Sequence, residues 1–161
     1  LACALIHTPK VLFLDEPTNG VDPVSRRDFW RILYQLLREK VTIFVSTAYL
    51  DEAERCNRVG LLHNGKLIAC GAPDEVKTLI RGKMVEVRSS APRRAAAVLR
   101  KSVDSVNIFG DRIHLLTEEP EKLIPRIETL FADAGLEFHG MRPIDPGLED
   151  VFISVLTQKE K

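Results

Sequence analysis

The chain has 161 residues, of which 45% are apolar, enough to build a hydrophobic core. Its Lys and Arg residues (23) balance its Asp and Glu residues (23), so the composition gives no electrostatic footprint for nucleic acid or for an anionic membrane. No apolar run approaches the ~20 residues that a membrane-spanning helix requires.

The chain starts without Met, at LACALIHTPK, a stretch typical of the last turns of a helix that Pro9 stops. We therefore expect the chain to be a piece of a longer protein. The cysteines are too scattered along the sequence to form a zinc site. We expect Cys3, Cys56 and Cys70 to be free, buried thiols in a reducing compartment.

A strand, a helix and a second strand are predicted next. The continuous apolar run Val11–Leu14 is typical of a parallel strand that is covered on both faces. Apolar residues at helical spacing predict a helix over about Ser25–Glu39, and the run VTIFVS predicts a strand at Val41–Ser46. Because these elements form a βαβ unit, the two strands should be parallel.

The following segment contains a stretch that imitates a phosphate loop. After a short helix at about Leu50–Cys56, the glycines and lysine of GLLHNGKL match the spacing of such a loop up to its final position, where Leu67 replaces Ser or Thr. A phosphate loop follows a strand and opens a helix, whereas Asn64–Gly65 lies between two β-type runs. We therefore predict a hairpin, followed by a helix at about Pro73–Ile80.

Arg81–Lys83 is typical of a linker, and the pattern beyond it changes. The predicted order there is βαββαβ, that of a split βαβ, ferredoxin-like domain. Strands are expected at Met84–Arg88, Val103–Phe109, Arg112–Thr117 and Leu136–Arg142. Helices are expected from near Pro92, from Pro120 to Gly135 and, last in the chain, at about Leu148–Leu156. The sequence thus predicts an α/β chain with a partial parallel-sheet domain over 1–82 and an accessory βαββαβ domain over 83–161.

The stretch VLFLDEPTNGVDP places two adjacent carboxylates at the end of the first predicted strand. Because side chains alternate along a strand, Asp15 and Glu16 should point apart rather than share a proton. An Asp at the carboxyl end of a parallel strand lies where ligands of open α/β sheets bind, and it can hold Mg²⁺, usually through water. The neighbouring Glu can orient or deprotonate an attacking water. The loop that follows leaves Asp22 available to a partner.

This stretch resembles the Walker B motif and D-loop of ATP-binding cassette (ABC) transporter ATPases, and FVSTAYLDEAERCNRVGLLHNGKLIACGAPDEV resembles the segment that follows it in that family. The resemblance covers about Leu1–Ile80. The remainder, which closes on PGLEDVFISVL, is similar to the accessory C-terminal domain of ABC-2-type exporters. The first domain is therefore implied to be part of a RecA-like P-loop NTPase.

The resemblance implies a role for each matching residue. Asp15 corresponds to the Mg²⁺ ligand and Glu16 to the catalytic residue that positions water. Asn19, Gly20 and Asp22 fall in the D-loop, which crosses to a second cassette in a homodimer or tandem protein, with two ATP molecules sandwiched between the cassettes. We expect Asn19 and Gly20 on the nucleotide side and Asp22 among the catalytic residues. Further implied partners are membrane-spanning permease subunits and a transported small molecule, at the cytoplasmic face of the cell membrane.

The chain departs from the family pattern in two ways. The phosphate loop, the Q-loop and the signature sequence lie upstream in the family, and this chain begins after them, so we expect it to hydrolyse no ATP by itself. The family also has His after Ser-Thr, at the γ-phosphate, where this chain has Ala48. The loss of one such donor costs ~3–4 kcal/mol, about 10²–10³ in rate, so we expect slow hydrolysis even in the longer protein.

Two other functions stay open from the sequence. The chain can be a non-enzymatic regulatory or dimerisation module, or part of a soluble ABC-type ATPase of DNA repair or translation; the neutral composition weighs against the last. An incomplete parallel sheet should expose apolar surface on its strands. We therefore expect residues 1–82 to be partly disordered or rescued by association between chains.

Overall fold

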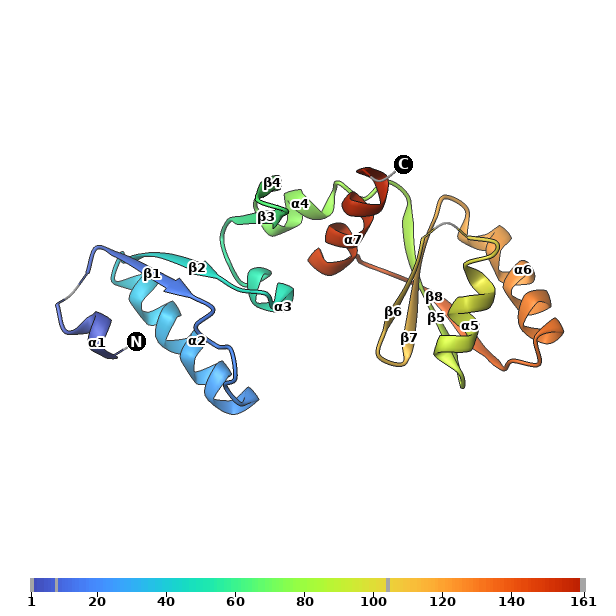
Figure 1. Ribbon diagram of the computed structural model, residues 1–161, viewed down its shortest axis with the longest axis horizontal. Coiled ribbons are helices and arrows are strands. Elements are labelled where there is room, and N and C mark those ends of the chain that lie inside the picture. The colour runs from blue at the N-terminus through green and yellow to red at the C-terminus, as the bar shows by residue number, and fades with distance from the viewer. Residues whose placement is uncertain (1, 8, 104, 160–161) are drawn as a thin grey trace. The chain divides into compact units, whose positions relative to one another are not determined.

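The computed structural model describes residues 2–7, 9–103 and 105–159 of a mixed α/β chain (Figure 1). The chain divides into two compact units, residues 1–53 and 54–161. Among the described residues, none of the helices combines the length and the apolar character needed to cross a lipid bilayer.

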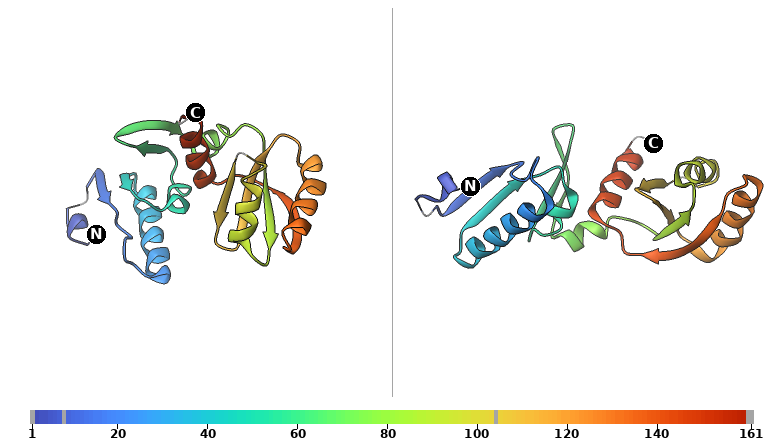
Figure 2. Two further views of the ribbon diagram at one scale, coloured as in Figure 1. Left: turned by 45° about the vertical axis from the view of Figure 1, so that its right-hand side comes forward. Right: turned by 90° about the horizontal axis from the view of Figure 1, so that it is seen from below.

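The first unit is built on two parallel strands with one long helix beside them (Figures 1 and 2). Its elements are α1 (Ala2–Leu5), β1 (Val11–Asp15), α2 (Pro23–Arg38), β2 (Thr42–Ser46) and α3 (Leu50–Ala53). The strands pair from Val11 opposite Thr42 to Asp15 opposite Ser46, which confirms the predicted parallel βαβ unit. Helix α2 buries Trp30 and Leu33, as the apolar spacing of this segment indicated.

One face of the β1–β2 pair is open. Phe13 and Phe44 lie opposite each other in the register, with ring centroids 5.7 Å apart, and their exposed fractions are 74% and 62%. The prediction that β1 is covered on both faces is therefore wrong for this structure, whereas the expected exposure of apolar side chains on these strands is confirmed. Leu12, whose side chain points to the other face, is buried.

The second unit begins with a hairpin and ends with a helix. Its elements are β3 (Val59–His63), β4 (Lys66–Gly71), α4 (Pro73–Lys77), β5 (Lys83–Ser89), α5 (Pro92–Leu99), β6 (Val106–Phe109), β7 (Arg112–Thr117), α6 (Pro120–Asp133), β8 (Phe138–Ile144) and α7 (Leu148–Lys159). Strands β3 and β4 are antiparallel, and the two residues between them have left-handed backbone angles, φ 49° at Asn64 and φ 72° at Gly65. This confirms the hairpin and excludes a phosphate loop at this position.

The elements from β5 to β8 follow the predicted order βαββαβ and form one antiparallel sheet in the order β6-β7-β5-β8. Helices α5 and α6 cover one face of this sheet (Figures 1 and 2). The core between them contains these buried side chains: Val85, Val87, Ala95, Ala96, Leu99, Val106, Ile113, Leu115, Leu123, Ile127 and Phe131. The alternate residues of the strands therefore point to the second face.

Several boundaries differ from the predictions for local reasons. Helix α2 starts at Pro23 rather than at Ser25 because Asp22 caps it. Strand β8 runs on to Ile144 and includes Pro143, which an edge strand tolerates. Strand β6 begins at Val106, and position 104 of the predicted Val103–Phe109 strand lies outside the described residues.

The cysteines also differ from the expectation. Cys3 and Cys70 are exposed, and Cys56 is half-buried. The prediction of buried thiols is therefore wrong for Cys3 and Cys70.

Candidate functional site

The predicted carboxylates lie at the carboxyl edge of the β1–β2 pair. Asp15 is the last residue of β1, and its register partner Ser46 is the last residue of β2. Because the strands are parallel, the loops that follow them leave the sheet at the same edge. The structure thus brings Asp15 and Glu16 beside Ala48, which follows Ser46 by two residues.

The two carboxylates have different hydrogen-bond donors. The Ser46 hydroxyl donates to Oδ1 of Asp15, and the Ala48 backbone N–H donates to Oε2 of Glu16 at 3.1 Å. Asp15 is exposed and Glu16 is half-buried, so both can reach solvent or a ligand. The fixed backbone and hydroxyl donors orient these side chains before any ligand arrives.

Glu16 has an unusual backbone conformation. Its φ is +42°, in the left-handed region that residues other than Gly rarely adopt. Its N–H donates to the carbonyl oxygen of Ser46 at 3.0 Å and to the Ser46 hydroxyl at 3.1 Å, which holds the backbone in this conformation. Such conformations concentrate at functional sites, because the surrounding contacts must stabilise them.

The loop after Glu16 is a compact turn whose tip is open to solvent. The N–H of Asn19 donates to the carbonyl of Glu16 at 3.1 Å, and the N–H of Val21 donates to the carbonyl of Thr18 at 3.1 Å. Gly20 has φ 73° and would meet no atom within 4 Å if it carried a Cβ. Asn19 and Gly20 therefore present an exposed surface, whereas Thr18 is buried beneath them.

Asp22 caps helix α2. Its Oδ1 accepts hydrogen bonds from the backbone N–H groups of Val24 and Ser25, each at 3.0 Å. Hydrogen bonding from Ser25, first from its side chain and then from its backbone, holds the pKa of the Asp22 carboxyl below its usual value. In this structure the carboxylate thus fixes the point at which the loop enters α2.

Glu52 on α3 belongs to the same site, although no sequence motif identifies it. It is fully buried, and its Oε2 accepts from the hydroxyls of Thr18 at 2.9 Å and Thr47 at 3.1 Å. The Nε of Arg26, on α2, lies 3.6 Å from Oε1. One carboxylate thus joins the loops that follow β1 and β2 to the long helix. Nothing in the pattern LDEAE distinguishes Glu52 from its acidic neighbours.

A second contact fixes the loop after β2. The guanidinium of Arg26 lies over the ring of Tyr49, 4.2 Å from its centroid, and the Tyr49 N–H donates to the Thr47 hydroxyl at 3.1 Å. Ala48 lies between Thr47 and Tyr49, so its N–H is held in place toward Glu16. The Ala48 side chain itself is exposed and offers no polar atom.

The donor atoms at this edge fit Mg²⁺ as part of a shared coordination shell. Asp15 supplies an exposed carboxylate, and Mg²⁺ is usually held by one or two carboxylates together with waters and substrate phosphates. In the described ranges there is no group of three or more His, Cys, Asp or Glu side chains that could hold a metal ion by themselves. A cation here therefore requires phosphate oxygens or water as its remaining ligands.

Comparisons with known proteins agree on one family, although no protein-family profile matches the chain. It is 54% identical over 77 residues to the probable multidrug ABC transporter ATP-binding protein YbhF of Escherichia coli, covering 48% of this chain and 13% of that protein. It is 36% identical over 162 residues to the Nod factor export ATP-binding protein I of Rhizobium etli, covering 99% of this chain and 49% of the relative. It is 31% identical over 160 residues to the daunorubicin resistance ATP-binding protein DrrA2 of Streptomyces coeruleorubidus, covering 95% of this chain and 50% of the relative. The chain thus spans about half the length of the relatives that it matches from end to end.

Proposed function

Since the chain belongs to the family of ABC transporter ATP-binding proteins, we propose that it forms the part of an ATP-binding subunit that carries the carboxylates of the hydrolysis site. The observation that carries this proposal is the parallel β1–β2 edge, where Asp15 and Glu16 are each held by a donor from the end of β2. In the longer protein this edge serves ATP hydrolysis coupled to export of a substrate across a membrane.

The proposed roles of the two carboxylates follow from their surroundings. Mg²⁺, when bound with ATP, supplies positive charge that neutralises the phosphate oxygens. Asp15, exposed and oriented by Ser46, holds the hydrated ion at the edge of the sheet. Glu16 has one oxygen on the Ala48 N–H, which leaves its other oxygen to orient and deprotonate a water. The two residues thus perform separate tasks.

Ala48 sets the expected rate of the proposed hydrolysis. Ala48 stands at the position where the family has His. The Ala48 side chain offers no hydrogen-bond donor, and the Ala48 backbone N–H already donates to Glu16. A missing donor at developing phosphate charge lowers the rate by about 10²–10³. We therefore infer slow turnover at this site, which Ala48→His should raise at least several-fold, because it recovers part of that loss.

The loop tip of Asn19 and Gly20 is the proposed contact with a second cassette, in a homodimer or a tandem protein. Both residues are exposed, and the left-handed φ of Gly20 keeps the turn compact. Asp22 fixes the end of this loop on α2, so we assign it an indirect part in catalysis. Permease subunits at the cytoplasmic face of the membrane and an exported small molecule complete the proposed assembly.

Two finer assignments of fold belong to the same proposal. We assign residues 1–82 to a RecA-like cassette and residues 83–161 to a ferredoxin-like accessory domain. The parallel β1–β2 pair supports the first assignment, and the antiparallel order β6-β7-β5-β8 with both helices on one face supports the second.

A hybrid protein tests the proposal directly. The half of the Rhizobium etli relative that this chain does not match is fused to this chain, so that the chain replaces the half that it does match. Release of phosphate from ATP is then measured for the hybrid, for its Ala48→His variant and for the chain alone. We expect none from the chain alone, slow release from the hybrid and a several-fold increase with His at position 48. Equal rates for the hybrid with Ala48 and with His, or turnover by the chain alone, would contradict the proposal.

A further inference from the structure

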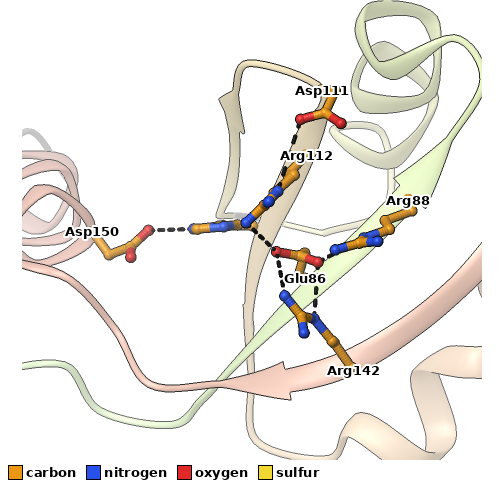
Figure 3. A network of polar contacts seen from close by, with 7 residues as sticks. Glu86, Arg88, Asp111, Arg112, Arg142 and Asp150 are labelled. Carbon is orange, nitrogen blue, oxygen red and sulfur yellow. Dashed lines mark hydrogen bonds and ion pairs between the residues drawn. The ribbon is translucent and has the colours of Figure 1, made fainter.

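The second face of the four-stranded sheet carries a cluster of arginines around one buried carboxylate (Figure 3). Glu86 lies in the middle of β5, with a side chain that is 2% exposed. Arg88 comes from the same strand, Arg112 from β7 and Arg142 from β8. We call Arg88, Arg112 and Arg142 the arginine cluster. It lies on the face that α5 and α6 leave uncovered, because Val85 and Val87 point to the helices.

Glu86 orients every member of the arginine cluster. Arg142 binds it through two bonds, Nε to Oε1 at 2.9 Å and Nη2 to Oε2 at 3.2 Å. Arg88 donates from Nε to Oε1 at 2.8 Å, and Arg112 donates from Nη1 to Oε2 at 3.4 Å. The hydrogen bonds from Arg142, followed by those from Arg88, lower the pKa of the Glu86 carboxyl to about 2, so it stays ionised at any physiological pH.

The arginine cluster carries more positive charge than Glu86 neutralises. Three guanidinium groups share one carboxylate, and those of Arg88 and Arg142 lie close enough to use the same oxygen atom. Because two guanidinium groups that bind the same oxygen atom lie close together, their positive charges repel each other. Asp111, 3.8 Å from Arg112, compensates little because its side chain is 91% exposed. Asp150, which is drawn in the same network, accepts a hydrogen bond from the Gly147 N–H and pairs with His114 at 2.9 Å instead of with an arginine of the cluster (Figure 3).

The arginine cluster also has donors to spare. A guanidinium has five N–H groups, and Arg88 uses its Nε on Glu86, which leaves its outer nitrogens without a partner among the described residues. The side chains of Arg88, Arg112 and Arg142 are 49%, 49% and 57% exposed, so these donors face solvent. Because Glu86 already fixes the guanidinium groups, a ligand loses little side-chain entropy on binding them.

We propose that the arginine cluster on this sheet face is a binding site for a phosphate group with two negative charges. A dianion would offset the two positive charges that Glu86 leaves unpaired. Its several oxygens suit the planar fork of donors that each arginine presents, which a single point charge would not use. This site is separate from the proposed ATP hydrolysis, because it lies within the βαββαβ segment and uses none of the residues at the β1–β2 edge.

A titration of the full chain with inorganic pyrophosphate tests the site. Nε–Hε signals of arginine are followed by NMR, and we expect saturable shifts in the signals of the arginine cluster. Arg112→Gln should weaken binding about 10-fold or more, because it removes charge-assisted hydrogen bonds. Arg112 makes the longest contact with Glu86, so this variant perturbs the fold least. The matched control is Arg126→Gln on α6, which removes the same charge from the opposite face and should leave the affinity unchanged.

A second variant separates a ligand site from a purely structural ion pair. Glu86→Gln removes the internal competitor for the arginine donors, so pyrophosphate should bind about 10-fold tighter, provided that circular dichroism shows the fold intact. Vesicles of equimolar phosphatidylcholine and phosphatidic acid, whose headgroup is a phosphate monoester that can carry two negative charges, form the second arm of the test. Binding to the vesicles, lost in Arg112→Gln, would identify the phosphate source as a lipid headgroup, whereas binding to pyrophosphate alone would identify a free phosphate compound. Saturable binding to neither probe, equal losses in Arg112→Gln and Arg126→Gln, or unchanged affinity in folded Glu86→Gln would overturn the proposal.

Discussion

The ion-pair network around Glu86 predicts an acid-sensitive component of stability in the second unit. The pKa of the Glu86 carboxyl lies at about 2 in the folded chain instead of 4.5, which corresponds to roughly 3 kcal/mol of stabilisation at neutral pH. Because the three guanidinium groups are about half exposed, solvent screening reduces this to roughly 1–3 kcal/mol. Since the folded pKa is the lower one, the stabilisation is fully present above pH 4.5 and is lost as the pH falls toward 2. Glu86→Gln should remove the same amount at neutral pH.

Urea unfolding followed by far-UV circular dichroism measures this effect. The chain's Trp and Tyr residues, Trp30, Tyr34 and Tyr49, all lie in residues 1–53, so tryptophan fluorescence reports unfolding of the first unit separately. We expect the free energy of unfolding of the second unit to fall between pH 4.5 and 2.5 in the wild type by more than in Glu86→Gln. An equal fall in both proteins, or a Glu86→Gln variant within about 0.5 kcal/mol of the wild type at pH 7, would refute the reasoning.

Three further substitutions test the other contacts. Glu52→Ala leaves the buried Thr18 hydroxyl without its acceptor and should lower the free energy of unfolding by about 1–3 kcal/mol, measured by Trp30 fluorescence. Asp51→Ala, at the exposed neighbouring position, should leave it almost unchanged. Equal losses in the two variants would contradict the assigned contacts. Asp22→Ala should lower the helicity of α2, whereas Asp22→Asn should retain it, because Asn can also accept the capping hydrogen bonds. Because the Asp22 pKa is lowered, the cap should be complete above pH 3.8 and weaken as the pH falls below that value. Helicity that changes neither in Asp22→Ala nor on acidification would be inconsistent with this geometry. Gly65→Ala should destabilise the β3–β4 turn by about 1–2 kcal/mol, because φ is 72° there, whereas Asn64→Gly should be tolerated. A larger loss of unfolding free energy in Asn64→Gly than in Gly65→Ala, measured by urea unfolding, would reject the assigned turn.

The parts of the fold that local patterns determine were predictable. The apolar run before Asp15, the helical spacing of α2 and the run before Ser46 are each local signals, and together they require a parallel βαβ unit. The hairpin was predictable for the same reason, because Asn64–Gly65 favours left-handed angles wherever it occurs.

The parts that depend on distant residues were not predictable. The partners of Glu52 include Thr18, which lies 34 positions away, and those of Glu86 include Arg142, which lies 56 positions away. No local pattern encodes these contacts, so both buried glutamates look like ordinary surface charges in the sequence. The exposure of Phe13 likewise depends on what covers the sheet, which a single strand does not specify.

Hydrolysis by the hybrid protein with Glu16→Gln most directly tests the proposed role of Glu16, activation of the water that attacks ATP. The substitution is nearly isosteric and keeps an oxygen for the Ala48 N–H, so the hybrid should still bind Mg²⁺–ATP. We predict that single-turnover hydrolysis falls by about 10²–10⁴, the usual contribution of a general base. Hydrolysis at the unaltered rate, with ATP binding retained, would contradict the assignment of this site.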